Sequence, residues 1–463
     1  MSFASPTTDR GHELAALASE LQLRDLSEDV LQSTRSTLLD ALGLASAGQS
    51  APGVGELLTT LAADTAGAVP VPWTSLRLPA GDAALATSAA IHGWDFDDTH
   101  DTAVVHACSV TVPAALSVGW IEDAPGDRLL EAIVVGVEVA CRLGRILGPA
   151  PGLIRTGSCG VFGAAAAAGH VLGLDPVQLN GALGTALSLS SSTRQVVVDG
   201  SLIKRLQPGF AARSGVLAAR LAAAGVLGPE HWLDGEFGLA ARRSPSLPNQ
   251  PARWPSSSPW EITQLSLKPY PACRYTHGAI LAAEQLSEGG WEAERTARVV
   301  VEVPDGDEHA LVARPWARRG DPLVDAQFSI PWLVAATLRV GRFDLSSLMP
   351  EALRDPATDA LARRVEVHRP HPQDPPGSLA PVRVSVERDD GFALSVTIRA
   401  LPGSPAEPLT WTDTTGKARG CLRFAGHQPE QADRLIDAVT DLPSRTARQL
   451  LASMSPSIDN EVS

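Results

Sequence analysis

One segment limits the fold of this chain more than any other: residues 160–174 consist mostly of alanine and glycine. A helix with small side chains all around has no single apolar stripe, and it suits a position that neighbouring helices approach closely. The segment is too short to span a membrane, and it carries His170. It therefore predicts a helix that is buried inside a helical domain.

Apolar periodicity predicts further helices on both sides of this segment. Residues 29–47 have apolar side chains at helical spacing, and residues 128–147 carry one broad apolar stripe. Asp175 is a suitable N-cap for a helix that runs through Ala186, and residues 208–227 form another amphipathic pattern. This part of the chain therefore predicts helices only.

The composition changes at residues 247–259, where proline and serine gather and predict a linker. Beyond it, valine-rich or alternating segments predict strands, and Asp389-Asp390-Gly391 predicts a hairpin turn between the last two. The predicted strands cover residues 297–303, 363–368, 381–387 and 392–398, and the predicted helices cover 324–338, 429–442 and 445–454. The last nine residues are expected to be disordered.

These patterns predict a mainly α protein with an inserted α+β domain. We expect the first part of the helical domain at residues 1–262, the α+β domain at 263–404, and a C-terminal return to the helical domain at 405–463. A chain of 463 residues exceeds one ordinary domain and can bury a large core without a metal or a disulfide.

The charge and the cysteine content argue against several classes of function. The net charge of −14 disfavours nucleic acid and anionic membranes as partners, and an anionic substrate would need a locally basic pocket. The five cysteines are scattered without a C-x-x-C pair, which argues against a disulfide framework, a structural zinc site and an iron–sulfur cluster. The sequence shows no signal-peptide pattern and no apolar run of membrane-spanning length. We therefore expect a cytoplasmic protein.

Lysine is rare in this chain: only three of its 38 basic residues are lysines, namely Lys204, Lys268 and Lys417. The excess of arginine, together with abundant alanine, indicates a GC-rich bacterial genome. A compact ammonium group can donate a proton or hold one carboxylate oxygen, whereas a guanidinium group stays protonated in proteins. Because Lys204 and Lys268 lie in the most motif-like segments, we expect a specific role for them.

The densest polar cluster is His92-Gly-Trp-Asp95-Phe-Asp97-Asp98-Thr99-His100-Asp101, which is followed by His106. Crowded carboxylates raise one another's pKa, and a histidine beside them can act as an acid or a base near neutral pH. Aspartates also suit helix capping, so Asp97 or Asp98 could be an N-cap. The pattern D-D-x-x-D at 97–101 also fits a magnesium–diphosphate clamp, but such pockets need aromatic walls and only 5% of this chain is aromatic.

Two further polar clusters suit the binding of carboxylates. Residues 190–194 and 199–205 supply hydroxyl groups, a lysine and arginines, with Arg194 as a candidate substrate ligand. Residues 268–277 contain a lysine, two tyrosines, a cysteine, an arginine and a histidine, and two prolines keep this segment extended. Each cluster taken singly is a weak signal.

Taken together, these segments resemble the MmgE/PrpD family, which includes 2-methylcitrate dehydratase, cis-aconitate decarboxylase and iminodisuccinate epimerase. The resemblance rests on residues 93–100, 106–116, 160–168, 200–206, 209–212, 215–219, 268–277 and 328–332. It implies a helical domain formed by both chain ends, an inserted α+β domain, and a homodimer that needs neither a metal nor an iron–sulfur cluster. The chemistry that it implies is acid–base catalysis on a di- or tricarboxylic acid.

The resemblance also implies roles for individual residues. The family's pocket positions persist here as Asp95, Thr99, His106, Lys204 and Lys268. His106 is expected to be the principal general acid or base, with Asp95 orienting or assisting it. The two lysines are expected to anchor carboxylates or to donate protons, and Thr99 is expected to contact the substrate.

Several positions depart from the family pattern. Ile154-Arg155 stands where decarboxylase-like members carry a His-Pro pair, and Trp332 stands at the position of a pocket tyrosine. Cys273 stands at the position of a second pocket histidine, one helical turn before His277. Arg155 could supply the lost positive charge from the adjacent position. These changes favour a substrate with fewer carboxylates, or a more apolar one, than citrate, and they argue against cis-aconitate decarboxylation.

The expected function is therefore a cofactor-independent lyase or isomerase that acts on a small carboxylic acid by dehydration, decarboxylation or proton-transfer isomerisation. An epimerase, or a cyclising isomerase of a specialised biosynthetic pathway, would use the same groups without losing water or carbon dioxide. A catalytically degenerate dimeric binding protein is the third alternative, which the changes at Ile154 and Trp332 motivate.

Overall fold

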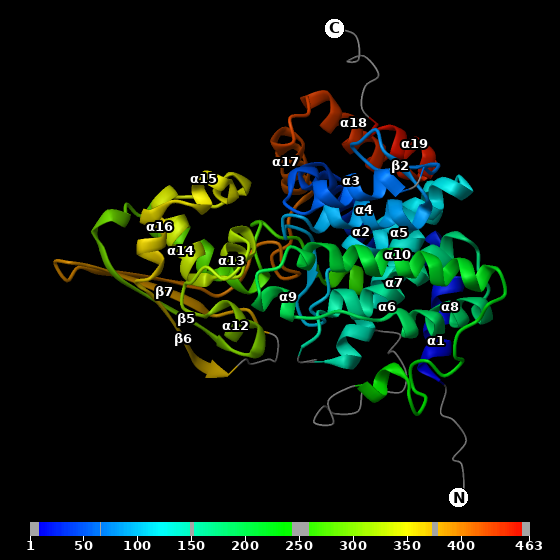
Figure 1. The fold of residues 1–463 in the computed structure, drawn as a ribbon, viewed down its shortest axis with the longest axis horizontal. Coiled ribbons are helices and arrows are strands. Elements are labelled where there is room, and N and C mark those ends of the chain that lie inside the picture. The colour runs from blue at the N-terminus through cyan, green and yellow to red at the C-terminus, as the bar shows by residue number, and fades with distance from the viewer. Residues whose placement is uncertain (1–8, 65, 149–151, 243–258, 373–377, 456–463) are drawn as a thin grey trace, which may run out of the picture.

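The structure is a computed structural model that describes residues 9–64, 66–148, 152–242, 259–372 and 378–455 (Figure 1). Almost all of the predicted linker at 247–259, and of the tail predicted to be disordered, lies outside these ranges. The described chain forms a large helical part and, beside it, a smaller part with helices on a four-stranded sheet. The prediction of a mainly α protein with an inserted α+β domain is confirmed.

The helical part is built mainly from the N-terminal half of the chain. Its helices are α1 (Arg10–Glu20), α2 (Glu28–Ala47), α3 (Val54–Asp64), α4 (Ala80–His92), α5 (Cys108–Glu122), α6 (Gly126–Leu147), α7 (Arg155–Val171), α8 (Pro176–Leu189), α9 (Gln195–Val198) and α10 (Ile203–Ala223), and its short strands are β1 (Val69–Pro70), β2 (Arg77–Leu78), β3 (Thr99–His100) and β4 (Leu265–Ser266). Within the described ranges, no helix combines the length and the apolar character that crossing a membrane requires.

Helix α7 lies inside this part, and all of its residues are buried. It packs against α5, α6, α8 and α10. Glycines allow these approaches: a Cβ on Gly163 would lie 2.6 Å from the carbonyl oxygen of Gly136 on α6, and a Cβ on Gly215 of α10 would lie 2.4 Å from the Cβ of Ala164. The predicted buried helix is confirmed, although it begins at Arg155 because the carbonyl group of Ile154 already accepts the amide of Ser158.

Two predicted helices differ from the structure. α10 begins at Ile203 rather than at residue 208, and Pro208 lies inside it, because the amide of Lys204 already bonds to the carbonyl group of Ser201. The helix predicted at 324–338 is two helices, α13 (Pro322–Gln327) and α14 (Ile330–Val340). The side chain of Ser329 accepts an amide of α14 and so caps a new helix at this point.

The α+β part is built on a sheet with the strand order β6-β5-β7-β8. Its elements are α11 (His277–Glu288), β5 (Thr296–Asp305), α12 (Asp307–Val312), α13, α14, α15 (Pro350–Leu353), α16 (Pro356–Ala362), β6 (Val365–Pro372), β7 (Val382–Arg388) and β8 (Ala393–Ile398). β5 pairs in parallel with β6 and antiparallel with β7, so Val299 lies beside both Val365 and Val386. The predicted hairpin joins β7 to β8, and Gly391 has the positive φ of 84° that its turn requires. α11 and α14 pack on the sheet.

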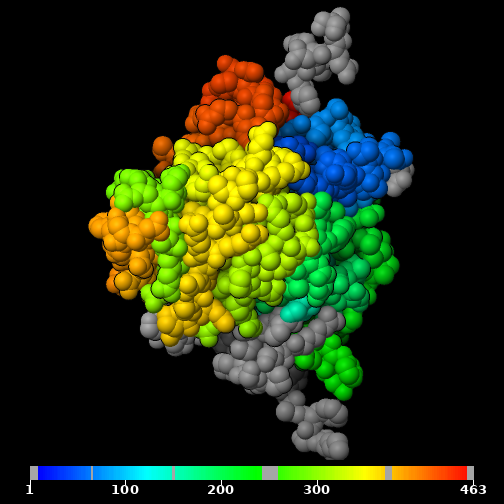
Figure 2. All heavy atoms as spheres, turned by 60° about the vertical axis from the view of Figure 1, so that its left-hand side comes forward, coloured from blue at the N-terminus to red at the C-terminus, as the bar shows by residue number. Residues whose placement is uncertain are grey.

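The C-terminal helices return to the helical part. They are α17 (Trp411–Phe424), α18 (Pro429–Thr440) and α19 (Ala447–Ala452). α17 and α18 pack on α2, and α19 packs on α5, so the red helices lie against the blue ones in Figure 1. In the space-filling view the α+β part lies in front, with the C-terminal helices above it (Figure 2). The residue numbers predicted for the domain boundaries stay predictions.

Candidate active site

The predicted site is organised around the loop 93–98, which joins α4 to β3. Five carbonyl oxygens of this loop accept hydrogen bonds from long side chains. The pairs are Arg205 with Gly93 (2.7 Å), Gln327 with Trp94 (2.6 Å), Lys268 with Asp95 (2.8 Å), Lys417 with Phe96 (2.8 Å) and His106 with Asp98 (2.8 Å). Asp95 has a left-handed backbone with φ 52°, which costs on the order of 1 kcal/mol or more for a residue other than glycine. We conclude that these bonds hold a strained loop in one conformation.

Two packing contacts bring the lysines to this loop. α10 packs along α4, which places Lys204 beside the loop. β3 pairs with β4 in the register of Thr99 with Ser266, so that Lys268 reaches Asp95 shortly after β4 ends. The site is therefore assembled by long-range pairing rather than by one continuous motif.

Asp95 forms a buried ion cluster with the two lysines. Its Oδ1 lies 2.8 Å from Nζ of Lys204 and 3.1 Å from Nζ of Lys268. Burial alone would raise the pKa of Asp95, but the two ammonium groups lower that pKa well below its ordinary value. Burial lowers the pKa of Lys204, and Asp95 opposes this effect. Asp95 is therefore an anion shared by two cations, and its Oδ2 has no hydrogen-bond partner among the described residues.

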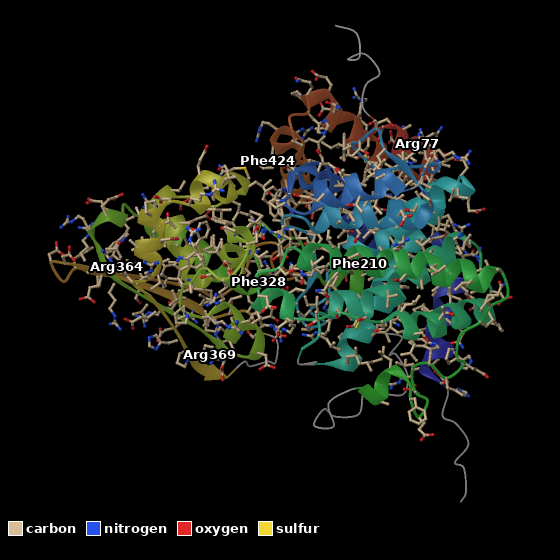
Figure 3. All side chains as sticks on the ribbon, in the orientation of Figure 1. Arg77, Phe210, Phe328, Arg364, Arg369 and Phe424 are labelled. Atoms are coloured by element: carbon tan, nitrogen blue, oxygen red, sulfur yellow. The ribbon has the colours of Figure 1, made fainter. Side chains whose placement is uncertain are left out.

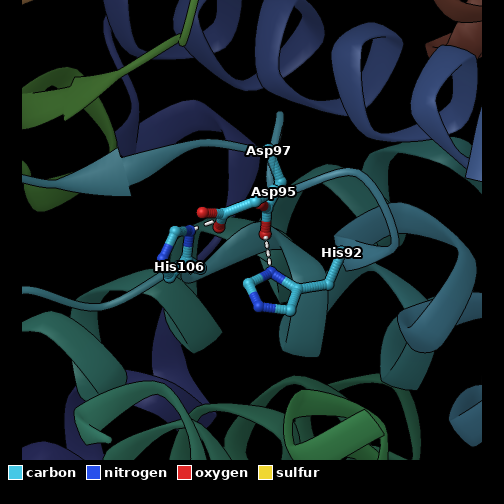
Figure 4. Close-up of side chains that lie close together, drawn as sticks. All are labelled: His92, Asp95, Asp97 and His106. Carbon is cyan, nitrogen blue, oxygen red and sulfur yellow. Dashed lines mark hydrogen bonds and ion pairs between the residues drawn. The ribbon is translucent and has the colours of Figure 1, made fainter. Parts of the chain in front are cut away.

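Asp97 links two histidines (Figure 4). Its Oδ2 lies 2.8 Å from Nδ1 of His92, and its Oδ1 lies 3.3 Å from Nδ1 of His106. Burial alone would raise the pKa of Asp97, but the two imidazoles lower it well below its ordinary value. Burial lowers the pKa of His92 to about 4, so this ring is neutral at pH 7 and donates through Nδ1 to Asp97. Nε2 of His92 then accepts a hydrogen bond from Lys204 at 3.0 Å.

His106 offers one ring nitrogen to a substrate. Its Nδ1 donates to the carbonyl group of Asp98, and its backbone amide donates to Oγ1 of Thr156 at 3.0 Å. Nδ1 therefore carries the proton of the neutral ring, and Nε2 is the basic nitrogen. The side chain of His106 is 17% exposed, against 7% for Lys204 and 0% for Lys268. Of these groups, the imidazole is thus the most accessible to a substrate.

Beside His106 lies a cavity of about 100 Å³, and all the predicted site residues line it except His277 and Trp332. The charged residues of its lining are five cations and two anions, namely Arg155, Arg194, Lys204, Lys268 and Arg274 against Asp95 and Glu308. An excess of three positive charges in the cavity of a protein with net charge −14 favours a small anion. Apolar side chains complete the walls, among them Phe328, which lies at the junction of the two parts (Figure 3).

A second charged group lies at the N-terminus of α7. Nη2 of Arg155 lies 3.2 Å from Oε1 of Glu308 on α12, and Nη2 of Arg194 lies 3.9 Å from the same oxygen. Arg155 also donates to the carbonyl group of Gly148 at 2.9 Å. Ile154 gives the cavity an apolar wall. Arg155 is therefore not a free replacement for a missing positive charge, because Glu308 already pairs with it.

The remaining three predicted residues occupy different places. Cys273 lines the cavity, and burial raises the pKa of its thiol to about 11, so that it keeps its proton at pH 7. His277 is buried outside the cavity lining, with Nε2 3.1 Å from the carbonyl oxygen of Ala272. Trp332 is buried in α14, where its ring lies 6.2 Å from that of Trp316, and it does not line the cavity either.

The three aspartates of the D-D-x-x-D pattern have separate partners. Asp97 contacts the two histidines described above. Asp98 accepts the amides of Ala107 (3.0 Å) and Cys108 (3.1 Å) at the start of α5, but it is not the N-cap residue of this helix, which is Ala107. Asp101 accepts the hydroxyl of Ser266 at 2.7 Å. The carboxylates do not converge as a magnesium–diphosphate clamp requires.

The four side chains drawn in Figure 4 could meet at a metal ion, because one ligand atom from each of His92, Asp95, Asp97 and His106 lies within 4.8 Å of the others. Lys204 already contacts both His92 and Asp95 at this place. A divalent cation would have to displace that ammonium group and would lie beside Lys268 as well. The donor set therefore fits an internal ion-pair network better than a metal centre.

His92 and Asp97 belong to the polar cluster of the sequence, but neither of them was predicted to be a site residue. Their spacing in that motif was the available signal, since both lie within five positions of Asp95. Glu308 was missed altogether, and nothing in its local sequence indicates that it faces Arg155, 153 positions away.

Comparison with known families gives two matches: the MmgE/PrpD N-terminal domain over residues 12–250 and the MmgE/PrpD C-terminal domain over residues 270–442. A cis-aconitate decarboxylase-like protein, oryM, of Aspergillus oryzae is 27% identical over 96% of each chain. The cis-aconitate decarboxylase of Aspergillus terreus is 27% identical over 86% of each chain, and that of Mus musculus is 25% identical over 97% of this chain and 94% of its own. Since these relatives are fungal and mammalian, the bacterial origin stays a prediction.

The two family domains cover most of the chain, and the relatives named here are decarboxylases or decarboxylase-like. This agrees with the resemblance seen in the sequence motifs. The protein is therefore an enzyme of the lyase or isomerase type, and the chain belongs to the MmgE/PrpD family.

Proposed function

We propose that this enzyme is a cofactor-independent lyase that acts by proton transfer on a small acid with two or three carboxylates. The observation that supports this most is the cluster of Asp95, Lys204 and Lys268 beside His106, in a cavity with three excess positive charges. Such a cavity attracts a polyanion, and the imidazole supplies the proton carrier.

In the proposed reaction, Lys204 and Lys268 contact a substrate carboxylate and stabilise the negative charge that develops beside it. Decarboxylation breaks the bond between a carbon and its carboxylate, and the electron pair stays on that carbon while carbon dioxide leaves. Protonated His106 then gives the proton on Nε2 to this carbon. In a dehydration, Nε2 would instead remove the proton next to the carboxylate, and a cavity acid would protonate the departing hydroxyl group.

Asp97 has a supporting role in this scheme. It accepts a hydrogen bond from His92, and its Oδ1 lies 3.3 Å from Nδ1 of His106. Its negative charge therefore stabilises the imidazolium form that His106 takes during the reaction. His92 stays neutral, because burial lowers its pKa to about 4, and it fixes one side of the Asp97 carboxylate. Proton transfer is therefore assigned to His106 rather than to His92.

Decarboxylation is the reaction that the named relatives favour, although Ile154 in the cavity lining argues against cis-aconitate itself as the substrate. An isomerase or epimerase is the second candidate, and one observation favours it. Ile154 stands where decarboxylase-like members of the family carry a histidine, so the cavity lacks that ionisable group. Cys273 and His106 line the cavity, and both can carry a proton there. The alternative of an inactive binding protein has less support, because Asp95, His106, Lys204 and Lys268 all line one cavity.

Proton NMR in deuterated buffer tests the proposal. The panel is cis-aconitate, citrate, 2-methylcitrate, iminodisuccinate and monocarboxylate analogues. Loss of carbon dioxide or water from a di- or tricarboxylate supports the lyase, and deuterium incorporation without loss of mass supports the isomerase. Turnover of monocarboxylates alone would contradict the assignment of the cavity to a polyanion.

We also propose that the enzyme is a homodimer, as the family resemblance implies, and that it is cytoplasmic, as expected from its sequence pattern. Light scattering during size-exclusion chromatography tests the oligomeric state, because the chain mass is 48.4 kDa. A mass near that of one chain at micromolar concentration would contradict the dimer.

A further inference from the structure

The third lysine of this chain also contacts the catalytic loop. Lys417 lies on α17, in the C-terminal return, and does not line the cavity. Its Nζ donates to the carbonyl oxygen of Phe96 at 2.8 Å and lies 2.8 Å from Oδ1 of Asp40 on α2. The same Nζ lies 3.9 Å from the centroid of the Phe96 ring. All three lysines therefore contact either Asp95 or the residue that follows it.

These contacts are buried, with side-chain exposures of 8% for Lys417 and 2% for Asp40. One compact ammonium group meets a carboxylate, a carbonyl oxygen and an aromatic face at once. A planar guanidinium group distributes its donors over separate nitrogens and cannot place one of them at all three partners. This geometry accounts for a lysine at position 417 in a chain that otherwise uses arginine for nearly all its positive charge.

The contact between Lys417 and the Phe96 carbonyl group is important because of its place in the loop, directly after Asp95. Lys268 holds the carbonyl group of Asp95, and Lys417 holds the carbonyl group of Phe96, so two successive peptide units are fixed. Asp95 has a φ of 52°, and its backbone conformation directs its carboxylate to Lys204 and Lys268. Freeing the Phe96 carbonyl group removes one of the bonds that hold this conformation in place.

We propose that Lys417 is a positioning residue: from the C-terminal helix it fixes the backbone after Asp95, and thereby the places of the Lys204 and Lys268 ammonium groups. Its effect on turnover rests on the proposed function, which makes those groups catalytic. Its effect on the geometry of the other two lysines does not rest on any assumed reaction. A purely structural role, in which the ion pair with Asp40 only joins α17 to α2, predicts a loss of stability without a change in the site.

Selective labelling of lysine at ¹³Cε tests the geometric part, because a chain with three lysines gives three signals. In Lys417→Met one signal disappears, and we expect both remaining signals to shift, because Lys204 and Lys268 meet Asp95 differently. Asp40→Asn keeps all three lysines and provides a second variant in case Lys417→Met does not fold. It should move the signals of Lys204 and Lys268 in the same directions as Lys417→Met does.

His170→Gln is the matched control. His170 is fully buried, bonds to the carbonyl group of Ala18 at 2.7 Å and to Glu131 at 3.1 Å, and lies outside the cavity lining. This variant disturbs a buried polar contact of similar kind and should leave all three lysine signals in place. If the signals of Lys204 and Lys268 keep their positions in both Lys417→Met and Asp40→Asn, the positioning role is wrong.

Steady-state kinetics then separates this inference from the proposed function. Lys417→Met should lower kcat about 10–100-fold, as small misplacements of catalytic groups do, while KM changes by less than about threefold. His170→Gln should keep its kcat per folded molecule. Shifted lysine signals with an unchanged kcat would contradict the catalytic role of the Asp95 cluster, whereas unshifted signals would contradict the role of Lys417.

Discussion

Two groups of charged residues line the cavity, and they are built differently. We call Asp95, Lys204 and Lys268 the lysine end, and Arg155, Arg194 and Glu308 the arginine end. At the lysine end, Asp95 is shared by two ammonium groups, and the three side chains are at most 7% exposed. At the arginine end, Glu308 is shared by two guanidinium groups at 3.2 and 3.9 Å, and it is 21% exposed. The lysine end is held by a loop whose carbonyl groups are bonded from several elements, whereas the arginine end joins α7 to α12 through a single carboxylate. The fixed lysine end is suited to hold the catalytic groups in place. At the loosely paired arginine end, a carboxylate of the substrate can take the place of Glu308 as the partner of the two arginines.

The largest effect is expected at the lysine end, from His106→Asn. The asparagine amide can still donate to the carbonyl group of Asp98, as Nδ1 does, but the variant lacks the proton-carrying Nε2. We expect kcat to fall by roughly 10²–10⁴-fold, with an unchanged circular dichroism spectrum. His106→Ala should lose turnover to the same extent. Full activity in either folded variant would show that another group transfers the proton.

The second prediction compares the two ends by their stability. Lys268→Met leaves the buried Asp95 with one cation, and the free energy of unfolding should fall by about 3–5 kcal/mol. Arg194→Met removes a partly exposed partner that lies 3.9 Å from Glu308, and it should cost about 1 kcal/mol or less. Urea denaturation of both variants gives the comparison. Equal losses would mean that the two ends are not built differently.

The third prediction concerns the pH dependence of stability at the lysine end. The pKa of His92 is lowered from 6.5 to about 4, because burial disfavours its charged form and Lys204 repels a second proton. Between these values the unfolded chain binds a proton that the folded chain does not, so His92 contributes stability above pH 6.5 and loses that contribution as the pH falls toward 4. The full difference is on the order of 3 kcal/mol.

The measurement is the difference between the wild type and His92→Asn in urea denaturation from pH 7 to pH 4. A difference is required because Asp98 and Glu138, whose pKa values burial raises to about 8 and about 7, act in the opposite direction. These contributions are common to both proteins and cancel. If the variant loses stability as steeply as the wild type on acidification, His92 is not the neutral group described here.

The same comparison explains how much could be predicted from the sequence. The helices and strands were predicted from local periodicity, whereas Asp95, Lys204 and Lys268 of the lysine end lie in three separate motifs and were assigned to one pocket through the family resemblance of those motifs. The arginine end depends on one contact between Arg155 and Glu308, far apart in the chain, and no local pattern encodes it. Trp332 was predicted to be in the pocket from its position in a motif, but packing in α14 keeps it outside the cavity lining. Local patterns thus identify which groups are present, whereas long-range packing decides which of them face the cavity.

The smallest effect is expected at the arginine end, from Glu308→Gln. The amide cannot form an ion pair with Arg155 or Arg194, so both guanidinium groups become available to a substrate carboxylate. A partly exposed pair contributes about 1 kcal/mol or less, so KM for a dicarboxylate should fall by no more than about fivefold. The value of kcat should stay nearly constant, because the lysine end is untouched.

The control for this variant is Glu302→Gln, which removes a carboxylate that pairs with Arg383 on the sheet, outside the cavity lining. It should leave KM unchanged. A monocarboxylate analogue held at the lysine end should gain nothing from Glu308→Gln, because it has no second carboxylate to offer the arginines. A rise of KM in Glu308→Gln would show that Glu308 holds the arginine end in its binding geometry. The two ends would then both be fixed, and the exchange of carboxylates inferred from their difference would not take place.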